Sequence, residues 1–480
     1  MRNTIFNILA YILILMGLFL LIPAFVSLFY GKELLLMFIY ISFCYLIIGS
    51  IMLFIYRKSE RLNFKEILVT VFFAWLTIAF TGALPYYFSG YVPSFIDALF
   101  ESISGFTTTG ATILTNIEIL PMSLLFWRSF TQWLGGIGIV VFVIAIIPSF
   151  GTQASHLFQS EVSGGIINNK ILPRVRNTAL LLLFVYFSLT LLQIISLSLA
   201  GINLFESIVH TFATVSTGGY SPFNDSIAYY SSPLVHYIIA IFMFLSGINF
   251  ILYSRFLLGH KKVFFKNQEF KFYLAIILFF TAIITYNLFG NVFSSLEEAF
   301  RNALFQVISI TTTTGYVTAD YDLWPELSRT FLFALMFVGG CVGSTGSSIK
   351  VFRIFILLRS VKIELLRIIH PSLIQNIKIE DEPIPSKTIN RVIKFILIYI
   401  FIFMIGTLVM SLFGLDLISS ITSSAVTLGN IGPGFGLVGP TMNYEFLQPL
   451  AKLFLSFLMI LGRLEIFTVL VIFMPGFWKD

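Results

Sequence analysis

Long apolar runs constrain this chain more strongly than any other feature of its sequence. Each holds about 20 or more mostly apolar residues, the length a helix needs to cross the hydrocarbon core of a membrane. These runs lie near residues 4–30, 34–56, 66–89, 122–147, 178–200, 231–258, 271–290, 326–358, 391–413 and 447–475. Only 11% of the 480 residues are charged, whereas an ordinary soluble domain has about 25%. The sequence therefore predicts an all-α integral membrane protein with ten transmembrane helices, the first too long to be a removable signal peptide.

The placement of basic residues predicts the orientation of these helices. Lysine and arginine gather at the termini and in alternate loops, near 57–65, 170–176, 255–271 and 350–394. The four intervening segments, 90–121, 201–230, 291–325 and 414–446, hold one basic residue, Arg301, and many acidic ones. Because basic loops stay on the cytoplasmic side of a membrane, we expect both termini in the cytoplasm and the acidic segments outside.

Each acidic segment also contains an apolar piece of about a dozen residues, such as "FIDALFESISGF". A helix of that length spans about 18 Å, too short for a core of about 30 Å, so we expect four re-entrant half-helices. A polar peptide follows each one: "TTTG" at 107–110, "VSTG" at 215–218, "TTTG" at 312–315 and "GNIG" at 429–432. Further glycines echo this pattern at Gly136, Gly247, Gly340 and Gly462. The sequence thus predicts four repeats of span, half-helix, polar peptide and span.

The composition of the four peptides suits a hard cation. Non-helical backbone at membrane depth is costly unless it is buried in protein or lines water, so four such segments should converge. Carbonyl oxygens can replace the hydration shell of an ion, glycine lets them turn inward, and hydroxyls add further oxygens. With no His or Cys among the ligands, a transition metal is disfavoured. The predicted filter residues are Thr107, Thr108, Thr109, Gly110, Val215, Ser216, Thr217, Gly218, Thr312, Thr313, Thr314, Gly315, Gly429, Asn430, Ile431 and Gly432.

A purely structural interpretation of these peptides competes with that of a cation site. A single "TTTG" is also typical of a helix–helix contact in a membrane or of an ordinary loop turn. Its recurrence at four equivalent positions, each after a half-helix, favours the ion site.

A run of glycines interrupts the predicted span 326–358. The stretch "VGGCVGSTGSSIK" makes an unbroken helix improbable, because each glycine costs about 1 kcal/mol relative to alanine. We expect a flexible intramembrane loop here, and the family resemblance given below implies that it gates the pore. The candidate gate residues are Gly339, Gly340, Gly343, Ser344, Thr345, Gly346, Ser347 and Lys350. The alternatives are a small-residue packing face for the loop and, for Lys350, a side chain that snorkels to the cytoplasmic surface.

Arg463 is the second gate candidate. It lies near the middle of the last predicted span, where a charge costs at least about 2.5–3.5 kcal/mol. Glu465 is two residues away and cannot face it on a helix. We expect Arg463 to point into the pore below the filter, as an electrostatic barrier or as a donor to gate-loop carbonyls. The alternative is a structural pair with a buried carboxylate.

The remaining polar residues indicate no enzyme. The five histidines have no partner at catalytic or metal-ligand spacing, and neither do Cys44 and Cys341. The acids are dispersed along the chain, and we expect Asp97, Glu206 and Asp416 mainly to cap the half-helices.

On these residues the chain resembles the TrkH branch of the Trk/Ktr/HKT superfamily of potassium transporters. The four repeats, the four filter-like peptides, "GGCVGSTGSSIKVFR" and "LGRLEIF" carry the resemblance, which covers nearly the whole chain. It implies four M1-P-M2 pore repeats around one pseudo-fourfold pore, with K⁺ as the transported and bound ion and no organic cofactor. It also implies that a glycine at each filter corner favours potassium, whereas a serine in the first repeat favours sodium in some relatives.

The resemblance further implies partners and boundaries. A homodimer in a bacterial cytoplasmic (inner) membrane is expected, with TrkA-like nucleotide-binding subunits docked in the cytosol. The basic loop 359–391 is a candidate docking face, although contact with anionic lipid is the alternative. No nucleic-acid partner is expected. The predicted parts are two extra N-terminal helices (1–60), repeat 1 (61–170), repeat 2 (171–265), repeat 3 with the gate loop (266–360), a cytoplasmic linker (361–388) and repeat 4 (389–480).

A different class of transporter remains open at this stage. A broken-helix secondary transporter for another cation or a small solute would also need interrupted spans. That class usually shows two repeats rather than four, which disfavours it here.

Overall fold

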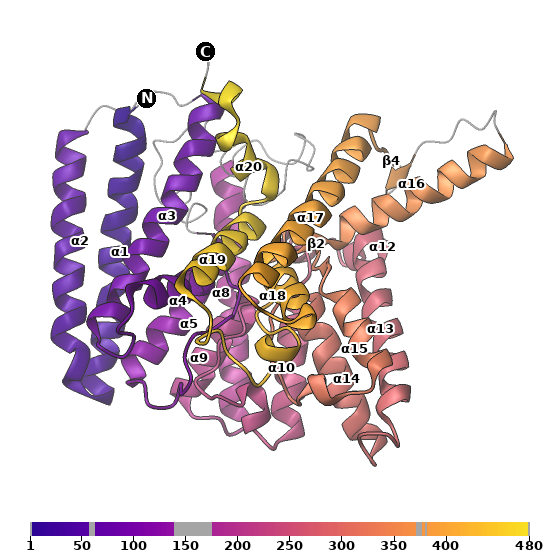
Figure 1. The fold of residues 1–480 in the computed structure, drawn as a ribbon, viewed down its shortest axis with the longest axis horizontal. Coiled ribbons are helices and arrows are strands. Elements are labelled where there is room, and N and C mark those ends of the chain that lie inside the picture. Colours follow the sequence, from indigo (N-terminus) through magenta and orange to yellow (C-terminus); the bar gives the residue numbers. More distant parts are fainter. Residues whose placement is uncertain (1, 57–62, 139–174, 371–376, 380–381, 479–480) are drawn as a thin grey trace.

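The computed structural model describes residues 2–56, 63–138, 175–370, 377–379 and 382–478, and most of this length is helical (Figure 1). Six of its helices are long and apolar enough to cross a membrane, and they coincide with six of the predicted spans. They are α1 (Arg2–Tyr30), α2 (Leu35–Ile55), α3 (Phe64–Phe88), α8 (Val175–Leu199), α13 (Gln268–Leu288) and α17 (Ser386–Leu412). The described part of the chain is therefore that of a multi-pass membrane protein.

Two predicted spans are bent pairs of helices instead of continuous ones. Helix α10 (Pro233–Ser246) meets α11 (Phe250–Leu257) at 89°, and α19 (Pro449–Arg463) meets the segment that contains α20 (Ile466–Leu470) at 115°. The first break is stabilised by Asn249, whose side chain accepts a hydrogen bond from the Ile251 amide and begins α11. The second coincides with Glu465, which has a left-handed φ of 58°. The runs predicted as spans at 231–258 and 447–475 are therefore bent within the structure, because local backbone geometry at Asn249 and Glu465 interrupts helices of uniform hydrophobicity.

The remaining two predicted spans, 122–147 and 326–358, are described as helix over only part of their length. Helix α5 (Met122–Ile137) ends at Gly138, and the rest of the run 122–147 lies outside the described residues. Helix α15 (Glu326–Leu335) ends early, and the chain resumes as a helix only at α16 (Val351–Ile369). Between them, β1 (Val338–Gly339) pairs in parallel with β2 (Ile349–Lys350). The glycine run therefore breaks the helix as predicted.

Four short helices lie among the long ones: α4 (Phe95–Phe106), α9 (Leu204–Val215), α14 (Leu296–Thr311) and α18 (Leu417–Gly429). Helix α4 packs against α3, α5 and α19; α9 against α8, α10 and α5; α14 against α13, α15 and α10; and α18 against α17 and α19. Each of α4, α9 and α14 thus contacts the helices before and after it. Helices α9 and α14 also contact a helix of the preceding quarter of the chain, and α4 contacts α19 of the last quarter. This order brings four peptides from distant parts of the sequence together.

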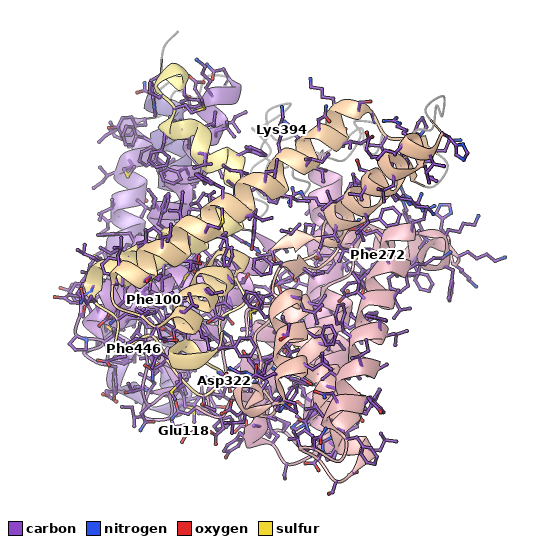
Figure 2. The ribbon with its side chains drawn as sticks, turned by 45° about the vertical axis from the view of Figure 1, so that its right-hand side comes forward. Phe100, Glu118, Phe272, Asp322, Lys394 and Phe446 are labelled. Carbon is purple, nitrogen blue, oxygen red and sulfur yellow. The ribbon has the colours of Figure 1, made fainter. Side chains whose placement is uncertain are left out.

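Small elements and the N-terminal pair complete the fold. Helix α12 (Val263–Lys266) precedes α13, and β3 (Lys378–Ile379) pairs antiparallel with β4 (Glu382–Pro383). Helices α1 and α2 pack against each other at one side of the molecule, and α16 extends away at the other (Figure 1). Lys394 lies toward one end of the molecule and Glu118 and Asp322 toward the opposite end (Figure 2), which agrees with the charge segregation in the sequence.

Candidate functional site

Three of the four short helices, α4, α9 and α18, begin with a side-chain cap. Ser94 caps α4 and Asn203 caps α9, each by accepting a hydrogen bond from the amide three residues on. Asp416 caps α18 as predicted, and its hydrogen bonds to Ser419 and Ile418 hold the pKa of its carboxyl below the usual range. The other two predicted caps were wrong, because their carboxylates have partners elsewhere. Asp97 pairs with Lys452 at 2.6 Å, and Glu206 accepts from the Tyr230 hydroxyl at 2.6 Å.

The inner ends of the four short helices share one backbone conformation. Each helix ends next to a residue with a left-handed φ: Thr108 at 55°, Thr217 at 55°, Thr313 at 61° and Asn430 at 52°. Two residues further along, each of the four segments has a glycine with positive φ: Gly110 at 83°, Gly219 at 78°, Gly315 at 81° and Gly432 at 103°. We call 107–110, 216–219, 312–315 and 429–432 the first to fourth corner peptides. Four peptides with three different sequences therefore adopt the same two-step turn.

This geometry corrects the sequence register of the second corner. The sequence expectation made Gly218 the equivalent of Gly110 and began the peptide at Val215. In the structure, Gly219 has the left-handed backbone, and Val215 is the last residue of α9. Hydrogen bonds agree, since the amides of Gly218 and Thr109 both bond back to their own short helices, to Ala213 and Ser104. The second corner peptide therefore lies one residue later than the sequence predicts. The sequence "TGG" does not distinguish the two alignments, because either glycine could adopt the left-handed conformation.

The four corners close into a ring. A Cβ built on Gly110 would have the Gly218 carbonyl oxygen as its nearest neighbour, and one on Gly219 would meet the Thr314 carbonyl oxygen. A Cβ on Gly315 would meet the Ile431 carbonyl oxygen, and one on Gly432 would meet the Thr109 carbonyl oxygen at 2.7 Å. Each glycine therefore lies against the carbonyl of the next corner, and the fourth corner returns to the first. Only glycine allows both this approach and this dihedral angle.

Hydroxyl groups brace the corners. The Thr107 and Thr109 hydroxyls are 2.8 Å apart, and the Thr312 and Thr314 hydroxyls repeat this contact at 2.8 Å. The Asn430 side-chain amide, in the fourth corner, donates to the Thr109 hydroxyl at 2.9 Å. The predicted hydroxyl oxygens thus stabilise the ring backbone by hydrogen bonds within it.

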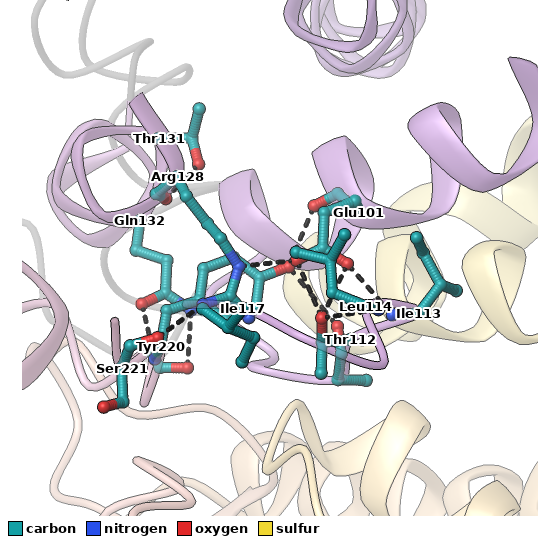
Figure 3. A network of polar contacts seen from close by, with 12 residues as sticks. Glu101, Thr112, Ile113, Leu114, Ile117, Arg128, Thr131, Gln132, Tyr220 and Ser221 are labelled. Atoms are coloured by element: carbon teal, nitrogen blue, oxygen red, sulfur yellow. Dashed lines mark hydrogen bonds and ion pairs between the residues drawn. The ribbon is translucent and has the colours of Figure 1, made fainter. Parts of the chain in front are cut away.

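A buried ion pair supports the first two corners, and sequence reasoning missed it (Figure 3). Arg128 Nε donates to Glu101 Oε1 at 2.7 Å, and both side chains are buried. Glu101 also accepts from the Thr112 hydroxyl and the Ile113 amide, while Arg128 Nη1 donates to the Ser221 carbonyl at 2.8 Å. The signal was available, because an arginine within an apolar run needs a nearby carboxylate. This pair links the peptide after the first corner to the peptide after the second.

The glycine-rich segment 338–350 lies directly against the inner side of the corners. The Ser347 amide donates to the Thr313 hydroxyl at 2.8 Å, and the Thr345 hydroxyl donates to the Val215 carbonyl at 3.2 Å. Gly346 is equally close, since a Cβ built there would meet the Thr312 carbonyl oxygen at 2.7 Å. The predicted gate residues Gly339, Gly340, Gly343 and Ser344 belong to the same segment, and the Gly340 carbonyl accepts from the Val351 amide. Lys350 donates to the Gly346 carbonyl, so its ammonium turns back to this segment instead of snorkelling away.

Arg463 joins this segment to two other elements. Its Nη1 donates to the Thr345 carbonyl at 3.0 Å and lies 3.4 Å from the Thr108 hydroxyl of the first corner. Its Nη2 donates to the Gly135 and Gly136 carbonyls at 2.5 and 3.1 Å. Glu465 pairs with Arg353 at 2.6 Å, so it is not the partner of Arg463, as expected. A cavity lies beside this cluster and is lined by Gly138, Thr345, Lys350, Arg353, Arg463 and Glu465, among others.

The glycine echo in α19 also shifts by one residue. A Cβ built on Gly462 would meet the Leu428 carbonyl, just as one on Gly135 would meet the Phe106 carbonyl, each the end of a neighbouring short helix. Gly462 is therefore the equivalent of Gly135, and Arg463 stands where α5 has Gly136. Within the described residues, no three His, Cys, Asp or Glu side chains gather as a metal site would require.

Four short helices that end in a closed ring of backbone, inside a shell of apolar helices, define a multi-pass membrane protein of the transporter class. The comparison with known proteins gives the family. The chain belongs to the TrkH family of cation transport proteins, whose model matches residues 36–479.

Named relatives and a solved structure agree with this assignment. The Trk system potassium uptake protein TrkH of Escherichia coli K12 is 38% identical over 463 residues, which cover 96% of this chain and 95% of that protein. The protein of that name from Vibrio parahaemolyticus is 34% identical, covering 100% of this chain and 99% of the relative. The crystal structure of the potassium transporter TrkH from Vibrio parahaemolyticus matches with a TM-score of 0.89 and 33% identity over the full length of both chains.

Proposed function

We propose that this protein takes up potassium ions across the cytoplasmic membrane through the ring of corner peptides. The observation that carries the proposal is the cyclic contact in which each corner glycine lies against a carbonyl of the next corner. A ring of backbone carbonyls can replace the hydration shell of a cation. The ring also answers a physical need, since non-helical backbone at membrane depth must be satisfied by protein or by what it lines.

The choice of potassium rests on chemistry and on the relatives. The corner peptides supply backbone and hydroxyl oxygens, which suit a hard cation. Relatives at 34–38% identity bear the name potassium uptake protein. Glycine occupies the left-handed position of all four corners, with Gly219 in the second. The proposed ion-binding residues are accordingly 107–110, 216–219, 312–315 and 429–432.

The gate is proposed to be segment 338–350 together with Arg463. Hydrogen bonds from Ser347 and Thr345 hold the segment against the corners, and Arg463 donates to its Thr345 carbonyl. An arginine beside the ring also places a fixed positive charge on the route of a cation, where low dielectric strengthens its repulsion. Movement of the segment would remove both obstacles at once.

The finer architecture is part of the same proposal. It comprises ten crossings with both termini in the cytoplasm, the four pore repeats and the domain boundaries given above, and a homodimer in a bacterial inner membrane. Nucleotide control would come from TrkA-like cytosolic subunits. The face around α16 and the start of α17 is the proposed contact, since it carries basic residues such as Arg359 and Arg367.

Ion flux into proteoliposomes tests the proposal. The purified protein, reconstituted with and without a TrkA-type subunit, should carry K⁺ and Rb⁺ faster than Na⁺. A folded preparation with no cation flux under either condition would refute the potassium pathway. Uptake of a small solute that depends on an ion gradient would instead support the broken-helix transporter, for which the bends of 89° and 115° would be the relevant feature.

A further inference from the structure

One side chain of α5 clasps the second corner on both sides of its glycine. Gln132 is fully buried, and its Nε2 donates to the Gly218 carbonyl oxygen at 2.6 Å. Its Oε1 accepts from the Tyr220 amide at 3.0 Å. Figure 3 shows Gln132 beside Tyr220. Gln132 therefore fixes the two peptide planes that flank Gly219, the residue with φ of 78°.

The oxygen that Gln132 holds is a member of the ring. The Gly218 carbonyl is the one that lies against Gly110, in the same way as the carbonyls of Thr109, Thr314 and Ile431 lie against the other three glycines. The position of this oxygen therefore depends on a hydrogen bond from outside the corner peptides. Because glycine permits many dihedral angles, the peptide planes around Gly219 would otherwise turn easily.

The sequence shows that this clasp occurs at one corner of four. The segment "QWLGG" (132–136) corresponds to "MFLSG" (243–247), "MFVGG" (336–340) and "MILGR" (459–463). The other three segments thus have methionine where α5 has Gln132, and a thioether cannot donate a hydrogen bond.

The residue that faces Gln132 differs in a matching way. A Cβ built on Gly218 would collide with the Gln132 amide group, so this site requires glycine. The equivalent positions in the other corners hold Thr109, Thr314 and Ile431. In this chain, glutamine at the helix position therefore occurs with glycine at the corner position that it faces. Methionine at the equivalent helix positions occurs with threonine or isoleucine at the equivalent corner positions.

We propose that Gln132 is a selectivity-determining positioning residue, which fixes the Gly218 carbonyl at the geometry that distinguishes potassium from sodium. This inference rests on the proposed function and names a further residue that controls it. Discrimination between the two ions depends on the placement or the number of ring oxygens. An oxygen held by a neutral amide donor keeps its place and still has a second lone pair for an ion.

The test compares three variants with the unaltered protein. Gln132→Met gives α5 the residue of the other three helices and removes both hydrogen bonds with little change in volume. Met243→Leu is the matched control, because it alters the equivalent buried position of α10 without touching a polar contact. Gln132→Met combined with Gly218→Thr recreates the methionine–threonine combination found at Met243 and Thr314.

The readout is the ratio of Rb⁺ to Na⁺ flux in proteoliposomes, with thermal unfolding in detergent measured in parallel. Gln132→Met should lower the ratio by about fivefold, the factor to which one lost hydrogen bond corresponds. Met243→Leu should keep the ratio, and the double variant should recover most of the loss. A structural role alone would shift the unfolding temperature and the total flux but leave the ratio unchanged.

Each result decides one question. If folded Gln132→Met transports with the unaltered ratio, the inference is overturned, and so it is if the double variant recovers nothing. If Gln132→Met fails to fold, Gln132→Leu replaces it, because leucine is uncharged and has neither the donor for Gly218 nor the acceptor for Tyr220; an unaltered ratio there also overturns the inference. Absence of flux in the unaltered protein would count against the proposed function instead.

Discussion

Replacing Arg128 with methionine should destabilise the protein by about 3–5 kcal/mol, because the change leaves a buried carboxylate without its counter-ion. Glu101 has no solvent exposure, and its pair with Arg128 spans 2.7 Å between Nε and Oε1. The carboxylate would keep its bonds from Thr112 and Ile113, which are too few to replace a full positive charge. The Arg128 guanidinium also lies 3.6 Å from the centre of the Tyr220 ring, so its loss affects the second corner as well.

A second variant separates the charge from the packing. Combining Arg128→Met with Glu101→Gln removes the unpaired charge while a side-chain oxygen still accepts from Thr112 and Ile113. The Ser221 carbonyl remains without its donor, which costs about 1–3 kcal/mol. The double variant should therefore be about 2 kcal/mol more stable than the single one. The free energy of unfolding, measured by denaturant titration in detergent, checks both values, and equal stability of the single and double variants would contradict a charge-based role for the pair.

Three further predictions concern the ring and the gate. Gly219→Ala should abolish transport and destabilise the fold, because it combines a strained dihedral angle with a collision against the Thr314 carbonyl. The control is Gly201→Ala, which has a similar φ of 91° but lies in open space and should cost only about 1 kcal/mol. Equal unfolding temperatures for the two variants would refute the assignment of Gly219 to the second corner. Gly110→Ser should shift the flux ratio of K⁺ to Na⁺ toward sodium, and an unchanged ratio would count against its place in the filter. Arg463→Ala should raise K⁺ flux by about tenfold or more, because one charged hydrogen bond to the Thr345 carbonyl stabilises the closed position of segment 338–350 by about 1.5–3 kcal/mol. Flux at or below that of the unaltered protein would indicate that Arg463 serves only to hold α5 and α19 together.

The predictable part of the fold followed from properties of single segments. Six spans appear where hydrophobic length places them, and the break after α15 falls within the glycine run. The bends at Asn249 and Glu465 were missed, because a cap or a left-handed residue within an apolar run leaves little trace in its hydropathy. The two false caps, Asp97 and Glu206, have the right residue type but sit inside the first turn, where a neighbouring Ser94 or Asn203 already accepts the free amide.

The candidate site divides in the same way. Its four peptides could be found from their recurrence, and Arg463 from the cost of a charge in an apolar segment. The register of the second corner could not, because "TGG" offers two glycines and only the backbone dihedrals distinguish them. The contributions of Glu101, Arg128 and Gln132 also escaped notice, since the contacts of Arg128 with Glu101 and Ser221 and of Gln132 with Gly218 join residues 27 to 93 positions apart.

The sequence by itself determined that the chain lies in a membrane, that four of its segments are too short to cross, and that one helix breaks at its glycines. These outcomes depend on transfer free energy and local backbone preference, which each segment carries in its own composition. Only the tertiary structure decided which carbonyl faces which glycine, that Glu101 pairs with Arg128, and that Gln132 clasps the second corner. Those contacts need atoms within about 3 Å of one another, and packing of helices distant in the chain is what brings them there.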